Sequence, residues 1–114
     1  MWGAVLIQGP SMVPTLRHGD AVLVRRGGRP VRPGDVVVAR FHSRPDLLVV
    51  KRAVRQEPGG WWLQGDNPLV TDDSRAYGLS RIEGRVVARY WPLPIRRLRP
   101  AMIDDQRCRD EGVD

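Results

Sequence analysis

Short apolar runs, rich in valine, alternate along the first ninety residues with clusters of Gly, Pro and Asp. This alternation is typical of short β-strands joined by turns. Dipeptides such as Gly27-Gly28 and Pro33-Gly34 mark the turns, because Gly and Pro favour turn conformations. The pattern therefore predicts six strands, in segments 2–8, 21–25, 35–41, 47–55, 60–64 and 81–90.

A mostly β fold with very little helix follows from this pattern. The spacing of the strands suits either a folded-over barrel or a pair of packed sheets. One helical turn is expected at residues 14–17, and no other window in the first ninety residues shows a sustained helical period. From Pro92 onward prolines and arginines dominate. We therefore predict one domain over residues 1–91 and a basic tail over 92–114, disordered or frayed toward its end.

The composition is that of one soluble globular domain. The 114 residues include 41% hydrophobic and 28% charged residues, which excludes a disordered chain. The longest apolar run near the N-terminus covers only residues 4–7, so neither a membrane-spanning helix nor a signal peptide is expected. We therefore expect a soluble cytoplasmic protein, for which a peripheral contact with a membrane remains compatible with the sequence.

The chain carries a formal net charge of +6. This charge would attract nucleic acid, anionic lipid or an acidic protein, and it does not indicate which of them is the partner. Its one cysteine, Cys108, excludes an internal disulfide. We expect no metal and no organic cofactor.

Lys51 is the single lysine among 19 basic residues. Arginine stays protonated in proteins, whereas a buried lysine can lose its proton and act as a base. Lowering a lysine pKa from about 10.4 to about 7 costs about 4.6 kcal/mol, which lies within the range of buried groups. Lys51 lies in the apolar segment 48–54, and the alternation of side chains leaves open which face of that strand is buried. The simpler alternative is an edge strand that carries charges against aggregation.

Two further segments have both a structural and a functional interpretation. Ser11 lies between Pro10 and Pro14, which fits a turn and equally fits a rigid loop that presents a nucleophile. Residues 65–67 and 71–75 form a polar loop, which is either a turn with an Asp-Arg ion pair or a part of the site that orients the Lys51 amine.

Together these segments resemble the type I signal peptidases and their relatives, which are proteases with a Ser-Lys dyad. The resemblance runs from about residue 9 to residue 78. It rests on Ser-Met-x-Pro-Thr-Leu at 11–16, Gly-Asp at 19–20, Lys-Arg at 51–52, Gly-Asp-Asn at 65–67 and Asp-Ser-Arg at 73–75. It implies a folded β-barrel like that of signal peptidases and self-cleaving repressors, with Ser11 as nucleophile and Lys51 as general base.

The resemblance also implies roles for the neighbours of the dyad. Thr71 stands where the family has a serine and would hydrogen-bond the Lys51 amine. Gly9 replaces a serine that donates to the oxyanion in some members, which leaves the Ser11 N–H as one donor. The residues implied to support the site are Asp66, Asp73 and Arg75, and those implied near the oxyanion or the substrate are Gly9 and Met12.

Without a visible membrane anchor, the chain resembles the maturation proteases of nickel-type superoxide dismutase, which remove a short N-terminal extension from a precursor. The alternative is an unanchored signal-peptidase-like protease that acts on secretory precursors. A second alternative is a non-enzymatic basic β-barrel that binds nucleic acid or anionic lipid, although no nucleic acid is expected as a partner. A triad built on His18 or His42 is disfavoured, because each histidine lies in a turn-like context.

Overall fold

The computed structural model describes residues 1–101 and confirms a mostly β chain. All six predicted strands are present, and the fourth and sixth are longer than predicted. A short helix, α1 (Ser74–Tyr77), and a two-residue strand, β7 (Arg96–Arg97), were not predicted. The predicted strands are β1 (Trp2–Leu6), β2 (Ala21–Arg25), β3 (Val36–Phe41), β4 (Arg44–Glu57), β5 (Gly60–Gln64) and β6 (Ser80–Trp91).

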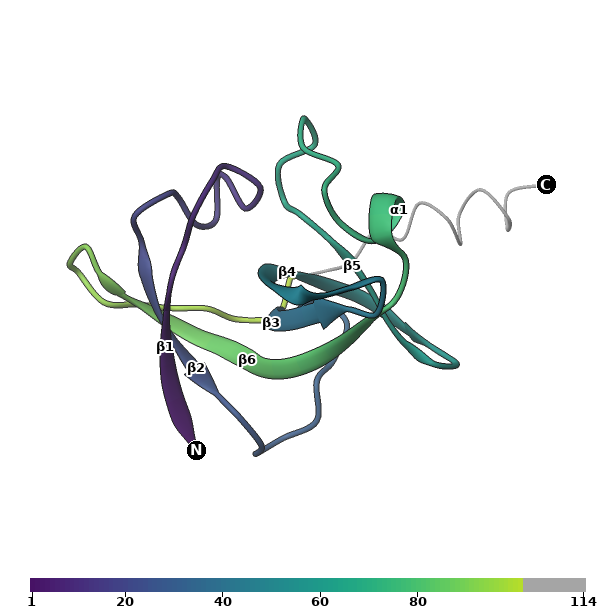
Figure 1. Cartoon of the computed structure of the whole chain (residues 1–114). Helices are drawn as coiled ribbons and strands as arrows, with labels where there is room; N and C mark the ends of the chain where they lie inside the picture. Colours follow the sequence, from purple (N-terminus) through teal and green to yellow (C-terminus); the bar gives the residue numbers. More distant parts are fainter. Residues whose placement is uncertain (102–114) are drawn as a thin grey trace.

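Strand β6 connects the two parts of the sheet. The strand order is β1-β2-β6-β3-β4-β5, with antiparallel pairing throughout, and β7 pairs with β6. The first half of β6 pairs with β3, and its second half pairs with β2. A further contact between Trp61 and Ser80 joins β5 to the start of β6. Figure 1 shows the resulting curvature, with β6 bending across the molecule beneath β3 and β4.

Two turns of the same sequence pattern, Arg-x-Gly-Asp, precede β2 and β3. In each turn the aspartate side chain accepts a hydrogen bond from the backbone N–H of the arginine three residues earlier, at 2.9 Å for Asp20 and 2.8 Å for Asp35. The glycine before each aspartate has a positive φ, +92° at Gly19 and +99° at Gly34, which other residues adopt at a cost. These turns therefore fix where both strands begin.

The predicted helical turn at 14–17 was wrong. Residues 11–15 form a hydrogen-bonded turn instead, in which the Leu16 N–H donates to the Met12 carbonyl at 2.9 Å. Pro14 lies inside this segment and has no N–H to donate, which limits a regular helix there. The helix lies at α1, where the Asp73 side chain accepts from the Arg75 N–H and caps its first turn.

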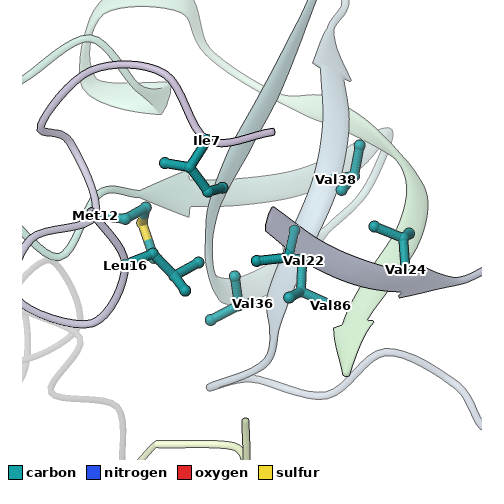
Figure 2. Close-up of a cluster of buried hydrophobic side chains, with 8 residues drawn as sticks. All are labelled: Ile7, Met12, Leu16, Val22, Val24, Val36, Val38 and Val86. Carbon is teal, nitrogen blue, oxygen red and sulfur yellow. The ribbon is translucent and has the colours of Figure 1, made fainter. Parts of the chain in front are cut away.

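The buried hydrophobic residues form two clusters. The first joins the loop between β1 and β2 to the sheet (Figure 2), and its buried members are Ile7, Met12, Leu16, Val22, Val24, Val36, Val38 and Val86. The second lies around Val37, Phe41 and Leu63. Val50 packs against the first cluster and Ala53 belongs to the second, so both faces of β4 are buried around Lys51.

Part of the predicted tail contacts the domain. Arg96–Arg97 pairs with β6 as β7, Leu98 packs against the first core cluster, and the Ala101 N–H donates to the Gly34 carbonyl at 3.0 Å. The predictions for residues 104–114 lie outside the described residues, as does Cys108. Within residues 1–101, no helix is long and apolar enough to cross a membrane.

The contribution of the loop to the core can be measured with two leucines. Leu16 is fully buried, whereas Leu69 is 91% exposed. Leu16→Ala should lower the free energy of unfolding by about 2–5 kcal/mol, because it leaves a cavity in the first cluster. Leu69→Ala should change it by less than about 0.5 kcal/mol. Urea denaturation followed by tryptophan fluorescence measures both, and equal effects would contradict the packing of the loop into the core.

Candidate active site

Ser11 and Lys51 lie in the same groove, although 40 positions separate them in the sequence. The groove has a volume of about 370 Å³. One wall is the end of β1 with the loop that follows, and the other wall is the middle of β4. Its lining is mostly apolar, and consists of Val5, Leu6, Ile7, Gln8, Ser11, Met12, Leu47, Leu48, Val49, Val50 and Lys51.

The loop that presents Ser11 is fixed at both ends. At its base the Ile7 N–H donates to the Asp20 carbonyl at 2.8 Å, and the Gly19 N–H donates to the Ile7 carbonyl at 2.9 Å. Immediately after Ser11, the Met12 side chain is only 1% exposed and packs in the first core cluster (Figure 2). The serine is therefore half-buried on a loop whose neighbouring residue is part of the core.

The loop after β5 lies against the Ser11 loop. The Asn67 N–H donates to the Ser11 carbonyl at 2.9 Å, and the Asn67 side-chain amide donates to the Pro10 carbonyl at 3.0 Å. A side chain at Gly65 would place its Cβ 2.6 Å from the Ser11 carbonyl oxygen, so only glycine allows this approach. In Figure 1 both loops rise on the same side of the sheet.

Asp66 links the two loops to β4. Its carboxylate accepts hydrogen bonds from the Thr15 hydroxyl and from the Arg52 guanidinium, whose Nε lies 3.1 Å from Oδ1. Arg52 also donates to the Gly34 carbonyl at 2.8 Å. The supporting role of Asp66 is expected from the sequence, whereas the roles of Thr15 and Arg52 are not. Both residues stand inside the motifs that carried the resemblance, which was the available signal.

Asp73 and Arg75 form a second support beside the groove. Asp73 is fully buried and accepts from the Gly65 N–H at 2.9 Å. The Arg75 guanidinium donates to both of its oxygens, at 3.0 and 2.7 Å. Burial would raise the pKa of Asp73, but the hydrogen bonds from Arg75 and Gly65 hold it below its ordinary value. This carboxylate is therefore ionised at neutral pH, and the positive charge of Arg75 balances its negative charge.

Lys51 is only 5% exposed. Burial lowers the pKa of its amine below the ordinary value, and the carboxylates of Asp73 and Asp72 act in the opposite direction. Arg75 adds to the lowering. Within residues 1–101 the amine has no hydrogen-bond or ion-pair partner that would hold it in the charged form.

A model of the Peptidase S24-like family matches residues 2–87. This range includes Ser11 and Lys51. It also includes Asp66 and the Asp73–Arg75 pair, which support the groove. The chain belongs to this peptidase family.

Named relatives of this S24-like peptidase agree with the assignment. Mitochondrial inner membrane protease subunit 1 of Xenopus tropicalis is 32% identical over 78% of this chain and 69% of the relative. The Homo sapiens protein of the same name is 32% identical over 80% and 70%. Mitochondrial ATP-independent inner membrane protease subunit 1a of Arabidopsis thaliana is 34% identical over 75% and 68%.

These comparisons confirm the prediction of a peptidase similar to signal peptidases and favour it over a non-enzymatic basic barrel. They give no support to the narrower branch of nickel dismutase maturation. They also give no support to a cytoplasmic location, because the relatives are named as inner membrane proteases.

The structure does not join every predicted residue to the dyad. Thr71 is exposed and does not line the groove, so its contact with the Lys51 amine stays a prediction. The Gly9 N–H donates to His18 Nδ1 at 3.0 Å, so this N–H already has an acceptor. His42 Nε2 lies 2.8 Å from the Gly59 carbonyl. Neither histidine lines the groove.

The burial of Lys51 predicts how stability depends on pH. The pKa of the folded protein is lowered, so the unfolded chain binds the proton more tightly, and stability rises as pH passes through the folded pKa toward the unfolded value. Lys51→Met removes this effect. The variant should therefore be more stable than the wild type at pH 7, and its advantage should shrink as the pH approaches 10.

Urea unfolding curves at pH 6, 7, 8, 9 and 10 measure this difference. Arg17→Met, which removes an exposed cation, should show no such pH-dependent gain. A constant difference between Lys51→Met and the wild type across this range would mean that the lysine pKa is not lowered.

Proposed function

We propose that this S24-like peptidase is a signal-peptidase-like serine endopeptidase that removes N-terminal segments from precursor proteins. Ser11 is the nucleophile and Lys51 is the general base. The supporting observation is that the two side chains line one groove in which the lysine is buried and its pKa lowered. A serine nucleophile requires activation by an adjacent base, and the shared groove supports this role for Lys51.

In the proposed reaction the neutral Lys51 amine accepts the proton of the Ser11 hydroxyl while the serine oxygen attacks the scissile carbonyl. The resulting ammonium gives this proton to the departing amine, and an acyl-enzyme remains. Lys51 then takes a proton from water, which attacks the carbonyl carbon of the ester. The bond between this carbon and the Ser11 oxygen breaks, the second product leaves as a carboxylic acid, and Lys51 returns the proton to the Ser11 oxygen. Within residues 1–101 the Ser11 N–H has no acceptor, so it is available as one donor to the oxyanion.

The walls of the groove suit an extended peptide. In the described part of the chain, strand β1 is at the edge of the sheet and pairs with β2 alone, so its other side can form backbone hydrogen bonds with a substrate. Leu6 and Leu48 are exposed at the rim, 57% and 39% respectively. The apolar lining favours a substrate with apolar or small side chains before the cleaved bond.

The signal-peptidase-like function is preferred over nickel dismutase maturation because of the relatives. Those proteins are named as inner membrane protease subunits. A membrane also fits a feature of the chain itself, the connection between β6 and β7.

That connection exposes apolar side chains next to arginines. Trp91, Leu93 and Ile95 are 58%, 65% and 69% exposed, and the exposed arginines of β7 follow directly. In Figure 1 this yellow-green segment projects from the body of the molecule. Apolar and aromatic side chains beside cations suit the interface of an anionic membrane. We therefore place the enzyme at a membrane surface.

Cleavage by the purified chain tests the proposed chemistry. The wild type should cleave a precursor with a secretory-type N-terminal segment, and mass spectrometry should locate one new N-terminus. Ser11→Ala and Lys51→Arg should each lower kcat/KM by at least about 10³-fold, because either change removes half of the catalytic pair. Ser43→Ala, which alters an exposed serine outside the groove, should retain full activity.

Lys51→Arg keeps the positive charge and removes the base, so a wild-type rate in this variant would refute the dyad. A nickel dismutase precursor is assayed in parallel. Cleavage of that precursor alone would replace the broader proposal with the narrower branch.

Membrane contact is tested by co-sedimentation with vesicles of phosphatidylglycerol and phosphatidylcholine. The double variant Leu93→Asp/Ile95→Asp should bind at least about tenfold more weakly, because it removes two apolar contacts and adds repulsion. Gln56→Asp/Pro58→Asp adds the same charge at exposed positions at the end of β4 and in the turn that follows it, and this variant should bind nearly as well as the wild type. Equal loss in both variants would show that charge alone, and not the apolar segment, governs binding.

A further inference from the structure

A second groove lies at the opposite end of β1 and β2 from Ser11. Its volume is about 290 Å³, and it shares no lining residue with the first groove. The turn that follows β2 forms one side and the middle of β6 forms the other. Its lining residues are Arg25, Gly27, Gly28, Arg29, Pro30, Val31, Ile82, Glu83, Gly84 and Arg85.

Positive charge is concentrated in this groove by the register of the sheet. Arg25 of β2 and Arg85 of β6 are direct cross-strand partners, and like charges in that position destabilise a sheet. Arg29 of the turn lines the same groove. Three arginines therefore line one depression.

The nearby carboxylates do not neutralise this charge. Asp35 already holds Arg29 with two hydrogen bonds of 2.9 and 2.7 Å. Glu83 lines the groove but accepts from Arg40 and Arg81, at 3.0 and 3.3 Å. Among residues 1–101, two of the three arginines in the groove therefore have no carboxylate of their own.

Among the three arginines of the groove, Arg85 is the one whose charge is least balanced by neighbouring groups. Within residues 1–101 it has no hydrogen-bond or ion-pair partner, and its Nε is buried. Burial lowers the pKa of this guanidinium, and Arg29 and Arg25 act in the same direction, against Asp35. A charged donor that is buried and unpaired costs free energy, which an anion in the groove would recover.

We propose that this groove is a binding site for a phosphate group, held by the guanidinium groups of Arg85 and Arg25. Arginine presents a planar fork of N–H donors that matches phosphate oxygens. Gly27 and Gly28 have no side chain to block an anion from the turn. The phosphate belongs either to a soluble anion or to the headgroup of an anionic lipid.

Thermal unfolding with two probes tests the site. Inorganic phosphate and glycerophosphoglycerol, the deacylated headgroup of phosphatidylglycerol, are each titrated to 10 mM at constant ionic strength. The wild-type Tm should rise by about 4 °C or more with at least one probe. Arg85→Gln should abolish the rise and should have a higher Tm than the wild type without any anion, because the repulsion from Arg25 is gone.

Arg81→Gln is the matched control, since Arg81 lies on the same strand and outside the groove; it should keep the wild-type response. A response to phosphate alone assigns a soluble anion, and a response to glycerophosphoglycerol assigns a lipid headgroup. An equal rise in Arg85→Gln and the wild type, or no rise with either probe, overturns the proposal.

Arg25→Gln should reproduce the loss if Arg85→Gln does not fold. Cleavage of precursor by either variant should stay at the wild-type rate, so this test is separate from that of the peptidase.

Discussion

The carboxylate of Asp66 is the contact on which the arrangement of the groove depends. It binds the Thr15 hydroxyl on the loop that presents Ser11 and the Arg52 guanidinium on β4. Arg52 follows Lys51 directly, and successive side chains of a strand point to opposite faces. The same short segment of β4 therefore turns one side chain toward the groove and uses the next to fix the distance between the strand and the serine loop.

The loop that presents Ser11 has further contacts besides that with Asp66. The serine loop is fixed by backbone hydrogen bonds at its base, by Met12 and Leu16 in the core, and by Asn67 from the facing loop. Each of these contacts comes from a different part of the chain. Their convergence orders a loop that would be mobile if it were attached only through its ends.

The strands could be predicted from the sequence because valine-rich runs and glycine turns carry local information. The long β4 and the pairing of β7 could not, because residues such as Arg44 and Arg96 become strand only through a neighbouring strand. Ser11 and Lys51 were identified from the resemblance, and their shared groove follows from topology that no local pattern contains. Arg52 was missed for the same reason, since its partner Asp66 is 14 residues away and is reached only once β5 is paired with β4.

The proposed chemistry requires a neutral lysine, and the charges around Lys51 oppose one another on this point. Asp73 and Asp72 favour the ammonium form, whereas burial and Arg75 favour the free amine. Arg75 spans both oxygens of Asp73, so it weakens the field of the carboxylate at the position of the amine. Asp73 can thus serve as the cap of α1 and as an acceptor for Gly65 while burial still lowers the pKa of Lys51. In this interpretation the Asp-Ser-Arg segment has two roles. It shapes the loop that packs on Ser11, and its arginine opposes the stabilisation of the Lys51 ammonium form by the buried carboxylate.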